Sequence, residues 1–357
     1  MEAFTVFIFL ATLFLAYANG ANDNFKGVAT LYGSGTTNYK KSLIYATIAT
    51  AIGSLMALYL ANELIIVFKG KGLVPDDVIQ MQNFPLAVGI GAALTVMSAT
   101  FFNLPVSTTH ALIGALAGAG WVSSKTGINW DVLSKAYFLP LIAGPILSLL
   151  LAFIIYPLFK KIREDLKIDQ ETCFCIGEKV IATAEGHGVT KEQFQNNFHA
   201  SLVLPEAAVA SQAYCRSSYS GKFAGISARN VLDGLHYLSS GLVCFSRGLN
   251  DTPKIAALLL IGSRFDLNIS IVVVSAVMAI GGLVHSKRIA VTMGEKITEM
   301  NPGQAFTANL VTGLMVLVAS RFGIPVSTTH VSCGSIFGIG ISKKNIDLKV
   351  LSQIILA

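Results

Sequence analysis

The sequence predicts an all-α protein that crosses a membrane several times and is built from two related halves. Three observations support this fold class: the composition, a series of long apolar segments and an internal repeat. Hydrophobic residues make up 53% of the 357 residues, whereas charged residues make up only 13%. Ordinary soluble domains carry about 25% charged residues. The composition therefore excludes an ordinary soluble protein and favours one that is embedded in lipid.

Five apolar segments are long enough, or nearly long enough, to cross a hydrocarbon core about 30 Å thick. They are residues 42–61, 84–102, 136–159, 268–284 and 305–320. Shorter and interrupted apolar segments raise the expected number of membrane segments to about ten. We therefore expect a multi-pass protein of the plasma membrane that is in contact with membrane lipid.

The N-terminal apolar segment resembles a secretory signal peptide, because small residues follow it at the position of a cleavage site. However, the residues before it include Glu2 and no basic residue. The Asn-Asp sequence directly after it also recurs in the second half of the chain. We therefore interpret this segment as the first span of the mature protein.

The net charge of +6 does not indicate a nucleic-acid partner. The basic residues form short clusters at the ends of apolar segments, as in Lys40-Lys41 and Lys343-Lys344. Such clusters are typical of loops that flank membrane spans. A further cluster at 160–167 predicts that the loop after it lies in the cytosol.

An internal repeat relates the two halves. The sequence LPVSTTH at 104–110 recurs as IPVSTTH at 324–330, with six consecutive identical residues. Upstream, NDNFK at 22–26 is echoed by NDTPK at 250–254. The offset from 22 to 250 is 228 residues and that from 107 to 327 is 220 residues, an agreement that unrelated similarities would not produce. The predicted organisation is a first membrane repeat at 1–160, a cytosolic insertion or linker at 161–230 and a second membrane repeat at 231–357.

The repeat also predicts a longer native chain. In the first half the apolar segment after Asp131 continues to Phe159, whereas the segment after Asp347 ends at Ala357. A second segment of equal length requires about 18 further residues.

The polar insertion is expected to form amphipathic helices, because its apolar stretches are too short to span a membrane. Within it, Cys173 and Cys175 precede His187 and His199. The paired C-x-x-C spacing that is typical of a zinc site is absent. We therefore expect free thiols rather than a metal site.

The PVSTTH sequence places polar groups at the start of a membrane helix. Proline breaks the preceding structure and fits the first helical turn, and serine and threonine are favoured N-cap residues. Because helix N-termini bind anions through free N–H groups, we predict that the two copies face one anion. The candidate anion-binding residues are Ser107, Thr108, Thr109, Ser327, Thr328 and Thr329. The alternative is a structural kink in which the preceding turn satisfies the hydroxyls.

Other polar side chains near these motifs are weaker candidates. His110 and His330 end the two motifs, where a histidine caps or orients its neighbours more often than it binds substrate. Gln304 and Thr307 open the segment before the second motif, where they either line the site or cap that helix.

The Asn-Asp pairs predict a cation site, because a carboxylate at membrane depth costs free energy and usually serves function. The candidate oxygen ligands, which suit sodium, are Asn22, Asp23, Asn250 and Asp251. Gly20 before the first pair and Pro253 after the second favour local unwinding of the chain. The alternative is a structural pairing of each carboxylate with the lysine three residues later, at Lys26 and Lys254.

Together the two motifs predict a mechanism. A multivalent anion and two buried carboxylates repel one another in a medium of low dielectric constant, so anion binding has to be coupled to Na⁺ or H⁺. The sequence thus favours a cation-coupled symporter. An intramembrane hydrolase is disfavoured because the sequence lacks a nucleophile elbow. A passive channel is disfavoured because channels use rings of charge along a continuous pore.

These motifs resemble those of the inorganic phosphate transporter (PiT) family. The resemblance rests on GANDN at 20–24, GLNDT at 248–252 and the two PVSTTH sequences, and it covers the chain outside the insertion. It implies sodium- or proton-coupled uptake of inorganic phosphate by alternating access, inverted repeats with discontinuous helices and re-entrant helix N-termini, and a homodimer. It implies a secondary transporter rather than an enzyme, with no cofactor and with Na⁺ as the coupling ion.

By position, the resemblance assigns the Asn-Asp pairs to the coupling sodium ions and the six hydroxyls to phosphate. Leu249 in the second half stands where the first half has Ala21, which leaves open whether the two cation sites are equivalent. Some members of the family carry sulfate. The alternative is therefore an H⁺-coupled phosphate or sulfate permease.

Overall fold

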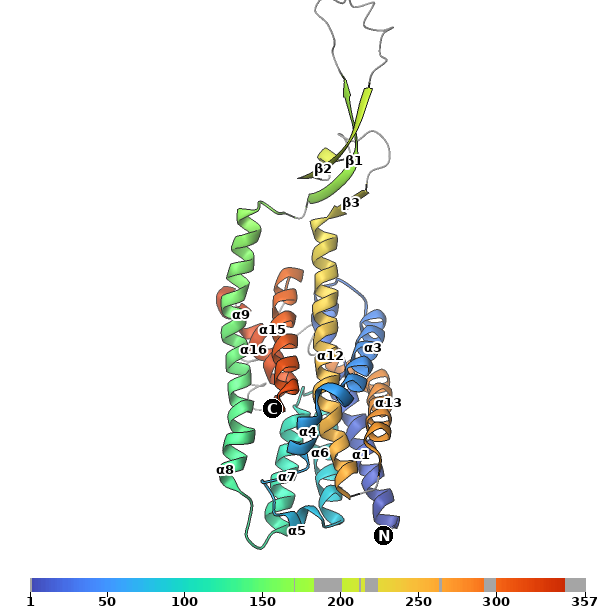
Figure 1. The fold of residues 1–357 in the computed structure, drawn as a ribbon, viewed down its shortest axis with the longest axis vertical. Coiled ribbons are helices and arrows are strands. Elements are labelled where there is room, and N and C mark those ends of the chain that lie inside the picture. The colour runs from blue at the N-terminus through green and yellow to red at the C-terminus, as the bar shows by residue number, and fades with distance from the viewer. Residues whose placement is uncertain are drawn as a thin grey trace, which may run out of the picture. The chain divides into compact units, whose positions relative to one another are not determined.

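The computed structural model describes most of the chain (Figure 1). The described residues are 2–169, 171–182, 201–211, 213–215, 224–262, 265–291 and 300–343. The chain divides into two compact units, one formed by 1–158 together with 236–357 and the other by 159–235. Residues 345–357, which the repeat relates to the apolar segment ending at Phe159, lie outside the described residues. His187 and His199 of the insertion also lie outside them.

Helices dominate the structure in both halves. The first half contains α1 (Glu2–Asp23), the 3₁₀ turn η1 (Lys26–Val28), α2 (Ala29–Gly33), α3 (Tyr39–Leu60), α4 (Asn62–Phe68), α5 (Asp76–Ile79), α6 (Asn83–Phe101), α7 (Thr108–Ser123), α8 (Trp130–Val132), the π turn η2 (Leu133–Phe138) and α9 (Leu139–Asp165). The second half contains α12 (Ala228–Gly262), α13 (Leu267–His285), α14 (Lys287–Val291), α15 (Pro302–Arg321) and α16 (Thr328–Lys343).

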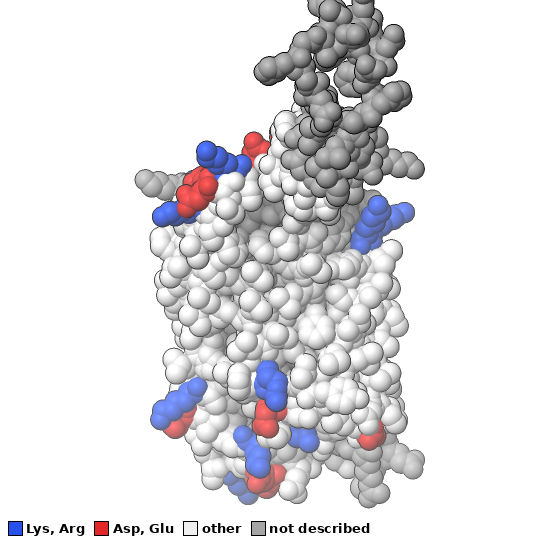
Figure 2. Space-filling model, turned by 45° about the horizontal axis from the view of Figure 1, so that its top comes forward, with Lys and Arg blue, Asp and Glu red and all other residues white. Residues whose placement is uncertain are grey.

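Among the described residues, six helical segments are long and apolar enough to cross a membrane. Five contain the apolar segments expected from the sequence, and the sixth runs from α1 into α2. Figure 2 shows a broad surface band without charged side chains, bordered by lysine, arginine, aspartate and glutamate. The prediction of a multi-pass helical membrane protein is therefore confirmed.

The described residues contain six spans rather than the expected ten segments, partly because the segment at 345–357 lies outside them and partly for two physical reasons. Helices α7 and α16 have 16 residues each, which is about 24 Å of helix and less than the hydrocarbon thickness. Helix α12 is long enough, with 35 residues, but it carries the charged residues Arg247, Asp251 and Lys254.

Two glycines set how closely the helices with the Asn-Asp pairs approach their neighbours. A Cβ atom at Gly20 of α1 would lie 1.9 Å from the carbonyl oxygen of Met278 in α13. A Cβ atom at Gly248 of α12 would lie 2.1 Å from the carbonyl oxygen of Thr50 in α3. Each glycine stands two residues before the asparagine of its Asn-Asp pair, so the close backbone contact fixes the position of the carboxylate.

The insertion contains a sheet where the sequence analysis predicted amphipathic helices, and that prediction is wrong for its described part. The antiparallel strands β1 (Thr172–Ala182), β2 (Ser201–Ser211) and β3 (Ala224–Ser227) lie in the order β2-β1-β3. The alternation along β1 explains the strand: Cys173 and Cys175 are buried, whereas Phe174 and Ile176 are exposed. Such a period of two residues is typical of a strand with one covered face.

The prediction of free thiols in the insertion is also wrong for two of its three cysteines. Cys175 forms a disulfide with Cys215, with a Cα–Cα distance of 6.2 Å. Cys173, one strand period before Cys175, is buried and free. The 40-residue separation of the bonded pair explains why spacing along the chain did not reveal it.

Candidate functional site

Each PVSTTH motif begins a helix, as its sequence predicts. Residues 104–107 are non-helical, α7 begins at Thr108, and the Ser107 hydroxyl accepts a hydrogen bond from the backbone N–H of His110 (3.2 Å). The second half repeats this arrangement at the start of α16, again at 3.2 Å, through Thr328, Ser327 and His330. Serine caps both helices because its oxygen satisfies an N–H group that has no partner within the helix.

The two helix starts face each other inside the protein. The hydroxyl of Thr109 donates to the carbonyl oxygen of Val326 (3.1 Å), and the hydroxyl of Thr329 donates to that of Val106 (3.3 Å). The rings of the two motif histidines lie 4.6 Å apart between centroids. The structure thus brings together two segments that are 220 residues apart in the sequence, with matching bonds from each half.

The asparagines of the Asn-Asp pairs hold the non-helical segments in place. The Asn22 amide donates to the carbonyl oxygen of Leu104 (3.0 Å) and accepts a hydrogen bond from the backbone N–H of Val106 (3.2 Å). In the second half, Asn250 donates to the carbonyl oxygen of Val326 (3.2 Å). Each asparagine therefore connects an Asn-Asp helix to the helix start of its own half.

The two carboxylates are buried and share a neutral donor that the sequence analysis did not identify. Asp23 and Asp251 are 1% and 2% exposed. The Asn19 amide lies 2.9 Å from Asp23 Oδ2 and 3.2 Å from Asp251 Oδ2. Thr108 also donates to Asp23 Oδ2 (2.9 Å). These contacts join the carboxylates of both halves to the first helix start.

The backbone differs between the two Asn-Asp pairs. Helix α1 ends at Asp23, so the local unwinding predicted there is present. Helix α12 continues through Asp251 and Pro253 to Gly262, so the unwinding predicted there is wrong. A proline inside a membrane helix removes one backbone hydrogen bond and kinks the helix, but neighbouring helices can hold it without a break.

Two lysines complete the bonding around the carboxylates. The Lys26 ammonium forms an ion pair with Asp23 and donates to the Val106 carbonyl oxygen (2.7 Å) and to the Thr329 hydroxyl (2.8 Å). The Lys254 ammonium lies 3.8 Å from the Asp251 carboxylate. It donates to the Val326 carbonyl oxygen (3.0 Å) and to the Thr109 hydroxyl (2.7 Å), which correspond by the repeat to the partners of Lys26. The lysine–carboxylate pairing that the sequence left as an alternative is therefore present in both halves.

Arg247 is a third buried cation, and the sequence analysis missed it. Its side chain is 2% exposed, donates to the Asn19 oxygen (2.9 Å) and lies 3.7 Å from Asp251. The available signal was an arginine within an apolar segment, four residues before the aspartate and so on the same helical face. We use the name paired-motif cluster for the residues Asn19, Asp23, Lys26, Thr108, Thr109, Arg247, Asp251, Lys254 and Thr329.

Gln304 and Thr307 serve helix α15 rather than the paired-motif cluster. The Gln304 side chain accepts a hydrogen bond from the backbone N–H of Asn301 in a capping box and donates to the Tyr156 hydroxyl (3.0 Å). Thr307 donates to the carbonyl oxygen of Gly303 in the preceding turn (2.9 Å). The contacts of Gln304 therefore favour helix capping, whereas the hydrogen bond of Thr307 lies within the helix.

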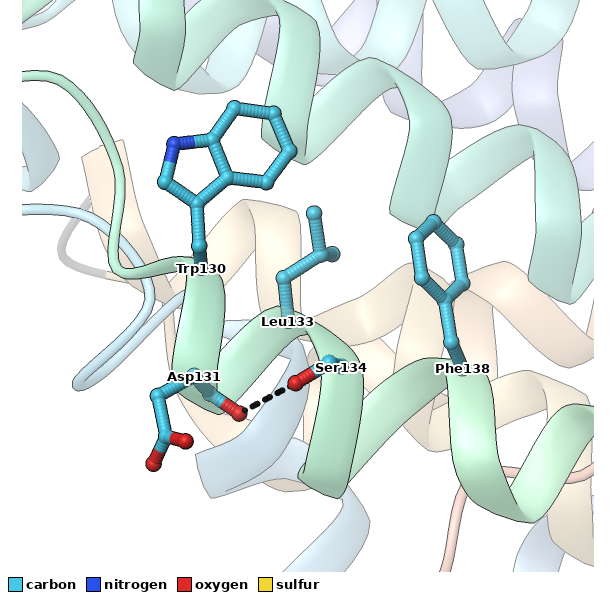
Figure 3. A pocket seen from close by; sticks show the side chains of 5 residues that line it. All are labelled: Trp130, Asp131, Leu133, Ser134 and Phe138. Carbon is cyan, nitrogen blue, oxygen red and sulfur yellow. Dashed lines mark hydrogen bonds between the residues drawn. The ribbon is translucent and has the colours of Figure 1, made fainter.

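A shallow pocket at the start of α8 and η2 is separate from the paired-motif cluster. Figure 3 shows its lining side chains, Trp130, Asp131, Leu133, Ser134 and Phe138. Trp130 and Phe138 are exposed, and the Ser134 hydroxyl donates to the carbonyl oxygen of Asp131 (3.0 Å). An exposed tryptophan at the end of a span is typical of the membrane interface, so we assign no substrate to this pocket.

A multi-pass helical bundle with buried charges and two helix N-termini inside it defines the class of membrane transporters for small ions. Comparison with known proteins supplies the family. The model of the phosphate transporter family matches residues 19–357, so the chain belongs to this family. The protein is accordingly a transporter and not an enzyme.

Relatives and a solved structure agree with this assignment. A candidate phosphate permease of Pyrococcus horikoshii is 25% identical over 96% of this chain and 90% of its own length. One of Pyrococcus abyssi is 26% identical over 100% of this chain and 94% of its own length. A solved structure described as the sodium-dependent phosphate transporter has the same fold, with a TM-score of 0.74 at 20% identity, and the match covers 99% of this chain and 94% of that one.

Proposed function

We propose that this chain carries inorganic phosphate across the membrane by alternating access and couples that movement to a cation. The observation that carries the proposal is the paired-motif cluster, in which both helix N-termini, two carboxylates and three cationic side chains are buried together. With Asp23 and Asp251 negative and Lys26, Lys254 and Arg247 positive, the cluster has a net charge of +1. A buried net positive charge favours an anionic ligand.

Phosphate would bind at the starts of α7 and α16. Free N–H groups and the positive end of the helix dipole attract an anion there. Six hydroxyls surround these helix starts, which suits an anion with several acceptor oxygens: Ser107, Thr108, Thr109, Ser327, Thr328 and Thr329. Two of these hydroxyls now donate across the halves, at Thr109 and Thr329, so binding would exchange protein acceptors for phosphate oxygens.

The coupling cation in this proposal acts on the two carboxylates. Asp23 and Asp251, with the neighbouring Asn22 and Asn250, present the oxygen ligands that the sequence analysis assigned to sodium. The name of the structural neighbour supports sodium as the ion. The proton is the second candidate, because the lysine ammoniums already contact both carboxylates.

Uptake by purified protein in proteoliposomes tests this function. We expect entry of radiolabelled phosphate to be accelerated by an inward gradient of Na⁺ or of H⁺, and unlabelled sulfate to compete less well than unlabelled phosphate. Liposomes without protein are the control. Phosphate uptake that responds to neither gradient would contradict cation coupling, and preferential competition by sulfate would change the substrate.

A further inference from the structure

The ammonium groups of Lys26 and Lys254 occupy positions with the ligands of a small alkali cation. Each Nζ atom is surrounded by a carboxylate, a backbone carbonyl and a threonine hydroxyl, and all of these groups present oxygen atoms. Oxygen ligands of this kind bind hard cations in proteins. The ammonium therefore satisfies the same groups that would otherwise require a bound ion.

The two positions are equivalent by the internal repeat. Each lysine follows its aspartate by three residues, and each takes the carbonyl of its own half and the hydroxyl of the other half. For Lys26 these partners are Val106 and Thr329, and for Lys254 they are Val326 and Thr109. Because the same contacts recur in both halves, they belong to the architecture of the repeat and are not one chance contact.

Burial of the two lysine ammonium groups costs free energy, which their oxygen partners offset. The residues are 6% and 1% exposed, and a buried ammonium is stable only when it is paired and hydrogen bonded. An ammonium has three hydrogen-bond donors, and Lys26 has three partners. A sodium ion at this position would have to displace the ammonium, because the oxygen ligands are already occupied.

We propose that Lys26 and Lys254 are tethered replacements for the coupling cations, so that this chain binds and carries phosphate without sodium. The inference rests on the proposed function, since it concerns the same cluster and the same cargo. A tethered ammonium attracts the anion but cannot cross the membrane with it. Of the two candidate coupling ions, this leaves the proton. The charged and titratable groups around the two ammoniums are Asp23, Asp251, Arg247, Cys333, His110 and His330.

The salt dependence of phosphate binding tests the inference without any variant. Binding of inorganic phosphate to the purified full chain is measured by calorimetry in equal concentrations of sodium, potassium or choline chloride. We expect affinities that agree within about twofold, because the two ammonium groups occupy the cation positions of the paired-motif cluster. Binding at least about tenfold tighter in sodium would overturn the inference and leave the proposed function intact. A lack of phosphate binding in all three salts would overturn the proposed function and the inference with it.

Variants that open the cation positions give the converse test. In Lys26→Asn and Lys254→Asn, we expect phosphate binding to be lost in choline chloride and to recover at least about tenfold in sodium chloride, because sodium can now reach the carboxylate. Lys26→Arg keeps the charge and should stay independent of sodium. Lys135→Asn, at an exposed lysine paired with Asp131, is the matched control. Folded asparagine variants that gain no response to sodium contradict the inference.

Discussion

Asn19 links the carboxylates of the two halves. Its amide contacts Asp23 and Asp251, and its oxygen accepts a hydrogen bond from Arg247. Because Lys26 and Asp251 each have partners in both halves, removing one partner leaves another charge or donor unpaired. Unpaired buried groups cost more free energy than the lost bond itself.

Neutralising either carboxylate should impair transport strongly. Asp23→Asn or Asp251→Asn keeps the shape of the side chain but leaves a buried cation without its counter-charge, a change that costs about 3–5 kcal/mol. We expect initial rates of radiolabelled phosphate uptake to fall at least about tenfold and the response to cation gradients to weaken. Asp131→Asn, at the exposed ion pair with Lys135, is the matched control. Full transport in both variants, with an unchanged cation response, would exclude these residues from coupling.

The hydroxyls at the helix starts should contribute to phosphate affinity. In the double variant Thr108→Val and Thr328→Val, the shape is kept and two donors are lost, and a hydrogen bond to a charged group contributes about 1.5–3 kcal/mol. We expect the KM for phosphate to rise about tenfold or more. Thr95→Val in α6, where the exposed hydroxyl donates only to Gly91, is the control. An unchanged KM would exclude these two hydroxyls from phosphate binding and leave the anion to the backbone N–H groups and the remaining hydroxyls.

At the scale of helices, the close approach of α12 to α3 positions Asp251.

Sequence patterns predicted the apolar helices well, because a membrane span is defined by length and composition. They predicted α12 less well, because its cationic and acidic residues interrupt the apolar pattern although their charges compensate one another in the fold. The strand β1 was missed since its short alternation became visible only when the covered face was known.

Replacing the glycine at the α12–α3 contact should separate the two helices. In Gly248→Ala the new Cβ atom would lie 2.1 Å from the Thr50 carbonyl oxygen, and overpacking of this kind typically costs about 1–3 kcal/mol. We expect a lower thermal unfolding temperature in detergent, together with slower phosphate uptake. Gly114→Ala in α7, where the Cβ atom meets no heavy atom within 4 Å, is the control. Equal unfolding temperatures for both variants would contradict the close-packing argument.

At the scale of the whole molecule, the internal repeat carried most of the predictive power. It indicated that two segments 220 residues apart would meet, and the hydrogen bonds between Thr109 and Val326 and between Thr329 and Val106 show this meeting. The sequence could not decide whether each aspartate waits for an external ion or pairs with its own lysine. That choice depends on the three-dimensional position of the ammonium relative to the opposite half, which no spacing along the chain reveals.

The same hydrogen bonds predict a carrier rather than a channel. Because the two helix starts bond directly to each other, phosphate passes only if these bonds break and the halves rearrange, and one conformation does not supply a continuous pore. Proteoliposomes loaded with unlabelled phosphate should therefore accumulate external radiolabelled phosphate transiently above its equilibrium level. Each unlabelled phosphate that leaves turns the binding site outward, where it binds a labelled phosphate and carries it in. Liposomes loaded with an impermeant anion are the control. Labelled phosphate that only equilibrates, at the same rate in both preparations, would indicate an open pathway and reject alternating access.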